Sequence, residues 1–492
     1  MTIISSQDVV SFNNQYLYII LTIFSIFFSC SFIGSDLGGL GAGVLYFFFL
    51  LFFTGVFSAT VFSVNQGIAM ICYTSLSILA IQLPIIGFFL GLYGDLNLPD
   101  VKIIIGLRPL LMSSLLLLLF FKYIPCLNNF HKCIVIFFIF SMFVSFLISS
   151  STVVDSGKYL INSFIPLFFG FFLVSMMIER TQEIISPKAT GSLSAYLVFS
   201  LLILCSCFFY SLSLDFSYDF FRPDLSSAYR AEHLGFIDYG DYPASWRDIV
   251  DGNLVIRMAG TFSDPIQFGY FCSFCSFFFL CSRKVFFKVI SLIFVYGLYL
   301  SASKGAAIFF IMSLSLFFVH LRIKILFWPM VFSITIVFLY FASSLSTSGK
   351  VHFAGLIGGI GSAFTAPPIN MVFGHGVGSG GNLSLSSVSS EVQDVSWLLT
   401  GSESGFGVLI FQMGFLGVLC LFLTVGHLLS ALKRSHVLQG HSKSSIASLI
   451  VSYLICFLLQ ENLINSSILC ILFLTIHMLV RAGDYQIKTS SR

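Results

Sequence analysis

Two cations flank one pair of expected membrane spans, and together they could hold an anion. Arg257 opens the stretch RMAGTFSDPIQFGYF, and Lys304 lies in LSASKGA, where a third apolar run begins. Two apolar runs separate them, so both cations should fall at the same face of a membrane. A lone cation at such a boundary usually extends to lipid headgroups. Because both residues lie in breaks rich in Gly, Ser and Pro, we interpret the pair as a built anion site.

Two further ionisable residues lie at apolar runs. Arg108, beside Pro109 in GLRPLLM, is several residues inside one run, and Glu403, in TGSESGFG, begins another. Ionisable residues at membrane depth are functional by default, and a positioned carboxylate can take a proton from a hydroxyl group. The alternatives are structural: Arg108 could pair with a backbone carbonyl, and Glu403 could cap a helix N-terminus. The sequence leaves both alternatives open.

The composition predicts a polytopic membrane protein. Of 492 residues, 57% are hydrophobic and 9% are charged, against about 25% charged in a soluble domain, and the mean hydropathy is +0.98. The 12 cysteines lie mostly inside apolar runs without paired spacing, which argues against a disulfide framework or a metal site. A net charge of +3 is too small to indicate a nucleic-acid partner.

We expect an all-α integral membrane protein with about 14 spans, or 12 to 13 if the shortest runs do not cross. Basic residues recur in alternate short connections, which the positive-inside rule places in the cytoplasm together with both termini. These residues are Lys122, Lys132, Arg180, Lys188, Arg283, Lys284, Lys288, Arg322, Lys324, Lys433, Arg434, Lys443, Arg481, Lys488 and Arg492.

The predicted organisation has five parts. Residues 1–214 form an N-terminal bundle, 215–264 a first long outer loop, 265–345 the central spans, 346–402 a second long Gly-rich outer loop, and 403–492 the C-terminal spans and tail. The N-terminal bundle should hold about seven helices. Both long loops fall on the face opposite the basic connections.

The first long loop has the residue types of a sugar-binding surface. It holds Arg222, Arg230 and Arg247, several carboxylates, and aromatic residues that include Trp246. Charged groups bond sugar hydroxyls, and aromatic rings stack on the apolar sugar face. An ordinary solvated loop with a short amphipathic helix is the alternative.

The second long loop contains the run GHGVGSGG, from Gly374 to Gly381, with Gly376 and Gly378 at its centre. Glycine backbone can approach a ligand closely and offer N–H groups to phosphate oxygens. A flexible linker has the same composition.

The stretch R-x-x-G-T-F-x-D-P-x-x-F-G from Arg257 and the later S-x-S-K-G resemble the signature region of the O-antigen polymerase and O-antigen ligase superfamily, over roughly residues 255–425. These are integral membrane glycosyltransferases with a GT-C-type architecture. The family more often has S-x-S-R-G, so Lys304 keeps the charge and loses the bidentate fork of an arginine. In the ligases a His-Asn pair opens a span eleven residues before a G-x-x-G step, and eleven residues before Gly414 this chain has Glu403 and Ser404. That difference favours a polymerase of the Wzy type.

The resemblance implies glycan chain growth at the periplasmic face of a bacterial inner membrane. A repeat unit on undecaprenyl diphosphate would attack the anomeric carbon of a polymer carried on the same lipid. Glu403 would be the base, and Arg257, Lys304 and Arg108 would neutralise the leaving diphosphate, assisted by the first loop. No cofactor or metal is expected, since neither long loop contains Asp-x-Asp. A chain-length regulator and a flippase are the expected protein partners.

Two other activities remain as alternatives. A ligase would transfer the glycan to a lipid A core. A lipid-linked oligosaccharide flippase also has about 12 to 14 spans, and it should concentrate cations along several helices around a central cavity. The polar residues of this chain are instead gathered in the two long loops, and internal repeats are not evident, which favours an enzyme.

Overall fold

The structure is a computed structural model. It describes residues 64–93, 98–127, 129–149, 151–180, 189–214, 247–250, 253–260, 262, 264–282, 284–344, 347–381, 401–435, 438 and 440–490. Nearly all of this is helical. The helices are α3 (Val64–Tyr93), α4 (Leu98–Tyr123), α5 (Asn129–Leu147), α6 (Val153–Tyr159), α7 (Phe171–Arg180), α8 (Ala189–Leu214), α11 (Pro265–Leu280), α12 (Val285–Leu300), α13 (Lys304–Arg322), α14 (Phe327–Ser344), α15 (Thr347–Thr365), α16 (Pro368–Phe373), α17 (Gly405–Arg434), α18 (Gly440–Phe457) and α19 (Ser466–Ser490).

Short 3-10 and π turns complete the helical elements. The 3-10 turns are η1 (Ile124–Cys126), η6 (Lys324–Leu326) and η10 (Glu461–Ile464). The π-helical turns η2 (Leu160–Phe164) and η3 (Pro166–Gly170) join α6 to α7, so Val153–Arg180 is one continuous apolar helix. A π turn encloses one residue more than an α turn and is rare.

The expectation of a helical protein with membrane-length helices is confirmed. Four helical stretches among the described residues are long and apolar enough to cross a membrane: Val153–Arg180, Lys324–Ser344, Lys304–Arg322 and Gly405–Arg434. In Lys324–Ser344 only 11% of the most apolar window is buried by the rest of the protein, and Trp328 and Phe332 are more than 60% exposed. Large apolar patches of this kind indicate a non-aqueous neighbour. The expected spans near Tyr16 and Gly43 lie outside the described residues.

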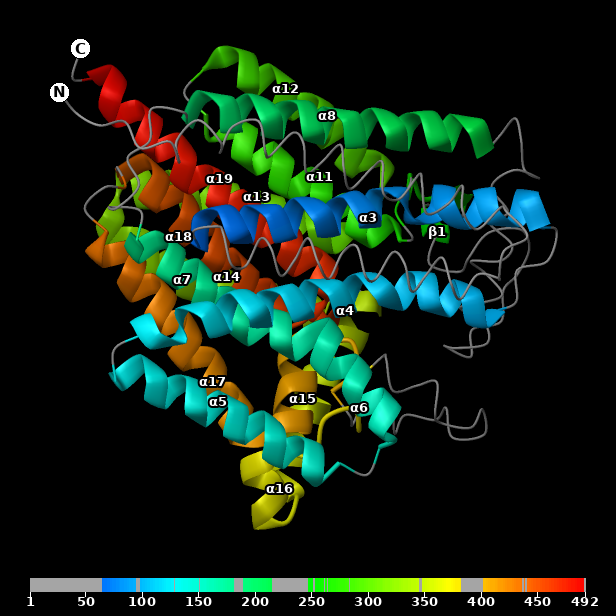
Figure 1. The fold of residues 1–492 in the computed structure, drawn as a ribbon, viewed down its shortest axis with the longest axis vertical. Helices are drawn as coiled ribbons and strands as arrows, with labels where there is room; N and C mark the ends of the chain where they lie inside the picture. Colours follow the sequence, from blue (N-terminus) through cyan, green and yellow to red (C-terminus); the bar gives the residue numbers. More distant parts are fainter. Residues whose placement is uncertain are drawn as a thin grey trace.

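The helices form a bundle (Figure 1). Helix α17 packs against α5, α7, α15 and α16, while α19 packs against α3, α8 and α11. Helices α17 and α19 therefore supply the centre around which the earlier helices are arranged. The C-terminus lies at the left of Figure 1, and the turn between α18 and α19 lies at the opposite end of the bundle.

The second long loop is in large part not a loop. Residues Thr347–Thr365 form α15, which packs along α17. A Cβ on Gly355 would lie 1.9 Å from the carbonyl oxygen of Ser402, and one on Gly359 would lie 2.7 Å from the Cα of Gly407. The glycines therefore allow two helices to touch backbone to backbone. The prediction of a Gly-rich loop over 346–402 missed this helix, because glycine spacing on one helix face also serves close packing.

The first long loop, residues 215–264, is described only at its end. There β1 (Arg247–Val250) and β2 (Asn253–Ile256) form an antiparallel hairpin with Arg247 opposite Ile256, so the expectation of an all-α chain misses this element. Both strands are rich in the β-branched residues Ile and Val, which favour strands. The proposed glycan-binding residues Arg222, Arg230 and Trp246 lie outside the described residues.

Candidate functional site

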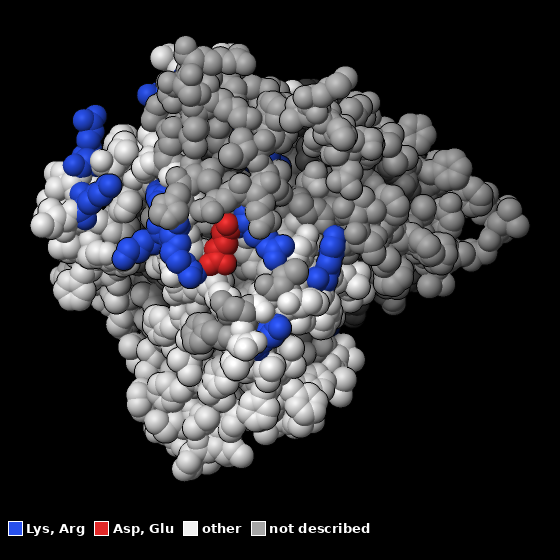
Figure 2. All heavy atoms as spheres, turned by 60° about the vertical axis from the view of Figure 1, so that its left-hand side comes forward, with Lys and Arg blue, Asp and Glu red and all other residues white. Residues whose placement is uncertain are grey.

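One end of the bundle collects basic residues from several connections. Figure 2, which brings the left side of Figure 1 forward, shows Lys and Arg side chains spread over that end. The guanidinium of Arg180 lies 5.1 Å from the ring centre of Tyr123, and Arg434 pairs with Glu179 at 2.5 Å. These contacts join the ends of α4, α7 and α17. We call this the basic end; its position relative to a membrane stays a prediction.

The opposite end holds a polar network centred on one short segment. This segment, Gln460–Ser467, comprises η10 and the residues on either side of it, between α18 and α19. We call it the 460–467 segment. It contacts each of the three groups that the sequence singled out: the Arg257 and Lys304 region, Glu403, and Arg108.

Glu403 does not cap a helix. Helix α17 begins at Gly405, and its N-cap is Ser404, whose hydroxyl oxygen accepts a hydrogen bond from the Gly407 N–H at 2.9 Å. Glu403 stands one residue earlier with φ of +70°, in the left-handed region that disfavours residues other than glycine. The capping alternative is therefore wrong.

Glu461 holds Glu403 in this conformation. The Glu403 N–H donates to Glu461 Oε2 at 3.0 Å, and the Glu461 N–H donates back to the Glu403 carbonyl at 3.1 Å. The other carboxylate oxygen of Glu461 accepts from the Tyr159 hydroxyl at 3.0 Å. Glu461 is only 6% exposed, so its carboxylate depends on these donors. Strained backbone kept in place by surrounding bonds is common at functional sites.

His352 of α15 completes the surroundings of Glu403. Its Nδ1 atom lies 2.8 Å from the Glu403 carbonyl oxygen and 3.4 Å from Glu403 Oε2. The side chains of both residues are about one quarter exposed. A carboxylate and an imidazole therefore meet at a surface that solutes can reach.

Arg257 lies against the loop that carries Lys304. Its Nε donates to the Ser301 carbonyl at 3.1 Å, and the Met258 N–H donates to the Leu300 carbonyl at 3.0 Å. Lys304 is the first residue of α13 and is exposed. The structure thus brings the two cations of the sequence motif to one short loop.

This loop also packs onto the 460–467 segment. A Cβ on Gly305 would lie 2.2 Å from the amide nitrogen of Gln460, and the Tyr270 hydroxyl donates to the Gln460 side-chain oxygen. Glu461 follows Gln460 directly and bonds Glu403. The loop that carries Lys304 and the residue Glu403 therefore both contact the 460–467 segment.

Arg108 reaches the far side of the same segment. The residue is 5% exposed, and its Nη1 donates to the Ser467 hydroxyl, which in turn donates to Asn465 Oδ1 at 3.0 Å. Its buried Nε has no hydrogen-bond partner among the described residues, and no described carboxylate pairs with it. A buried guanidinium without a counter-ion is costly, which suits a position that receives an anion.

The glycine run does not offer its N–H groups to a ligand. Helix α17 is interrupted at Gly414, with φ of +61°, and the carbonyls of Phe411 and Gln412 accept instead from His375 and Gly376 at 2.8 and 3.1 Å. The Gly378 N–H donates to the Gln412 side chain at 2.9 Å. The expected phosphate cradle at Gly376 and Gly378 is therefore not what the geometry provides.

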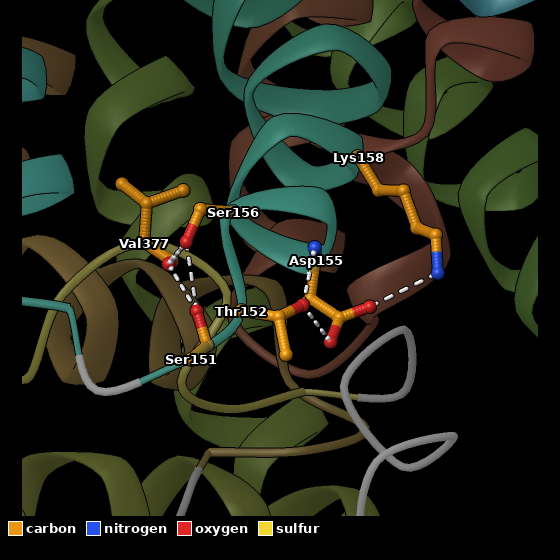
Figure 3. Close-up of polar contacts among 6 residues, drawn as sticks. All are labelled: Ser151, Thr152, Asp155, Ser156, Lys158 and Val377. Carbon is orange, nitrogen blue, oxygen red and sulfur yellow. Dashed lines mark hydrogen bonds and ion pairs between the residues drawn. The ribbon is translucent and has the colours of Figure 1, made fainter.

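The glycine run is instead hydrogen-bonded to residues at the start of α6. Figure 3 shows the hydroxyls of Ser151 and Ser156 directed at the Val377 carbonyl, at 3.0 and 2.7 Å, beside the Asp155 and Lys158 pair. A Cβ on Gly376 would lie 2.2 Å from the Cα of Ser149. The glycines serve close backbone packing between α5, α6 and α17.

Sequence reasoning missed two contributors to this site and undervalued a third. Tyr159 and His352 gave no signal, because single polar residues in apolar or Gly-rich stretches are common. At Glu461 the polar string QEN between two apolar runs marks a turn, and the sequence alone favours a structural role there. The described residues contain no cluster of His, Cys, Asp and Glu that could hold a metal ion.

Comparison with known proteins adds no relative. No family model matches the sequence, and neither the curated proteins nor the solved structures gave a match.

Proposed function

We propose that this chain is a membrane glycosyltransferase that polymerises a lipid-linked glycan. The proposal rests on the contacts of the 460–467 segment. Glu403, Arg108 and the loop that carries Lys304 are far apart in the sequence, and all three contact this segment. In this proposal the protein has a GT-C-type architecture with about 14 spans. The reaction takes place at the periplasmic face of a bacterial inner membrane.

The reaction needs two kinds of group. An acceptor hydroxyl must lose its proton, and the Glu403 region assists that step. A polyprenyl diphosphate leaves the anomeric carbon with the bonding electron pair, and its developing charge is neutralised by Arg257, Lys304 and Arg108. Arg108 is buried and fixed, whereas Lys304 is exposed at the start of α13. In this proposal Arg108 meets the diphosphate from the buried side of the 460–467 segment, and Lys304 meets it from the exposed side.

The test is polymer synthesis by the purified protein in detergent from repeat units linked to undecaprenyl diphosphate. Arg257→Ala and Lys304→Ala should each raise the activation free energy by about 2–4 kcal/mol. Lys304→Arg keeps the charge and should retain activity. Lys324→Ala, which removes an exposed cation near the basic end, is the matched control and should have no effect.

Three outcomes separate the candidate activities. Polymer formation by the wild type, lost in the two alanine variants, supports the proposal. Transfer of a preformed polymer to lipid A core, without polymer growth, would identify a ligase. Movement of labelled repeat units across proteoliposomes, without new glycosidic bonds, would identify a flippase. Normal polymer formation by both alanine variants would remove the cations from the mechanism.

A further inference from the structure

The imidazole of His352 has a fixed tautomer. Its Nδ1 lies 2.8 Å from the Glu403 carbonyl oxygen. A carbonyl oxygen can only accept a hydrogen bond, so Nδ1 must carry the proton. In the neutral ring the other nitrogen, Nε2, then has a lone pair and accepts protons. His352 is about one quarter exposed, and no described residue bonds its Nε2.

The carboxylate of Glu403 lies beside the same ring. Glu403 Oε2 lies 3.4 Å from Nδ1. The backbone of Glu403 is held by Glu461, which binds Tyr159, so the carbonyl that faces the ring is fixed in place. A histidine oriented by a carbonyl and a carboxylate is an arrangement suited to general-base catalysis.

We propose that His352 Nε2 is the atom that takes the proton from the acceptor hydroxyl, and that Glu403 positions and stabilises the ring. This inference rests on the proposed function and names the proton acceptor within the same site. It also gives the left-handed backbone of Glu403 a role, since that conformation lets both the carbonyl and the carboxylate of one residue face the same imidazole.

The acceptor O–H bond breaks, and its proton goes to Nε2. The hydroxyl oxygen pair forms the new bond to the anomeric carbon, while the bond from that carbon to the lipid diphosphate breaks and its electron pair leaves with the diphosphate. The imidazolium then releases the proton to water.

Substitution by asparagine separates catalysis from structure. In His352→Asn the side-chain amide nitrogen occupies the place of Nδ1 and can still donate to the Glu403 carbonyl, but nothing replaces Nε2. Polymer synthesis should fall about 10²–10⁴-fold, with unchanged melting temperature and unchanged binding of the lipid-linked repeat unit. A merely structural histidine would leave the asparagine variant near the wild-type rate.

Glu403→Gln supplies the second comparison. This variant keeps the carbonyl that orients the ring and loses only the carboxylate charge, so its rate should fall less, on the order of tenfold. His320→Asn is the matched control, because His320 Nδ1 lies 2.7 Å from the Ser444 hydroxyl near the basic end. This control should keep the wild-type rate.

Chemical rescue tests whether the imidazole ring itself is what the reaction needs. Imidazole added to His352→Ala should restore part of the polymerisation rate, and it should not restore Arg257→Ala. A near-normal rate for His352→Asn, or a larger loss in Glu403→Gln than in His352→Asn, would overturn the inference while polymerisation by the wild type stands. A wild-type protein that forms no polymer would instead overturn the proposed function, and the inference with it.

Discussion

The two ends of the bundle differ in how exposed their charged side chains are. At the basic end the Arg434 and Glu179 side chains are 58% and 30% exposed, and Arg180 contacts the Tyr123 ring. At the other end Glu461 is 6% exposed, and each of its carboxylate oxygens has a donor. Surface charges of the first kind contribute little to stability individually. Buried charges of the second kind depend on every partner.

This difference indicates different tasks. Exposed cations in short connections set the orientation of a chain in a membrane through their number, and no single geometry is needed. A buried carboxylate with fixed donors sets the geometry of its neighbours instead. Substitutions at the two ends should therefore differ in both the size and the kind of their effects.

The largest effect should come from Gly376→Ala. The residue has φ of +97°, and the new Cβ would lie 2.2 Å from the Cα of Ser149, so neither backbone nor side chain can relieve the contact cheaply. We expect a loss of about 3 kcal/mol or more, measured as lower melting temperature and yield. Gly361→Ala is the control: nothing lies within 4 Å of its Cβ, and this helical site should gain up to about 1 kcal/mol. Equal stability of the two variants would contradict the packing described for the run.

A somewhat smaller loss is expected for Glu461→Ala. The change leaves the Glu403 N–H and the Tyr159 hydroxyl without their acceptor. Two unsatisfied buried donors should lower the free energy of unfolding by about 2–4 kcal/mol, measured by thermal or denaturant unfolding in detergent. Tyr159→Phe removes one of the two bonds and should cost less. If Tyr159→Phe costs as much as Glu461→Ala, the Glu403 bond contributes nothing.

Glu403→Gly should separate stability from activity. Glycine accepts φ of +70° without strain, so the variant should be up to about 1 kcal/mol more stable than Glu403→Ala. Both variants lack the carboxylate and should make polymer equally slowly. Melting temperature and polymer synthesis, measured on the same preparations, test the two statements. A glycine variant less stable than the alanine variant would show that the residue is not strained.

The smallest effect should come from the exposed pair at the basic end. Arg434→Ala removes an ion pair whose arginine is mostly exposed and whose glutamate is partly exposed, so the free energy of unfolding should change by about 0–1 kcal/mol. Polymer synthesis should not change. A loss as large as that of Glu461→Ala would abolish the distinction between the two ends.

The sequence was informative where patterns repeat along the chain. Long apolar runs predicted helices that could cross a membrane, and the structure has such helices in Val153–Arg180 and Gly405–Arg434. The spacing of Arg257 and Lys304 around two apolar runs also placed them at one face. Here Arg257 bonds Ser301, three residues before Lys304. Periodicity and span counting need no knowledge of tertiary contacts.

The sequence was misleading where one composition is compatible with two different structures. The glycines of 347–361 suggest a loop, yet Gly355 and Gly359 let α15 pack closely against Ser402 and Gly407 at the start of α17. Likewise His352, Tyr159 and Glu461 come together only through tertiary contacts between segments far apart in the chain. No local pattern specifies which of many single polar residues will meet.

The two π turns between α6 and α7 give this helix a tolerance for a change in length. Tyr159, before these turns, bonds Glu461 at one end of the bundle, and Glu179, after them, bonds Arg434 at the other. Because a π turn encloses one residue more than an α turn, loss of a single codon within 160–170 would turn one π turn into an α turn and leave the two halves of the helix nearly in register. A deletion in α7 would instead rotate the residues after it by about 100°, and Glu179 would face away from Arg434. Descendants of this gene should therefore tolerate a single-codon deletion within the π turns far more readily than one within α7.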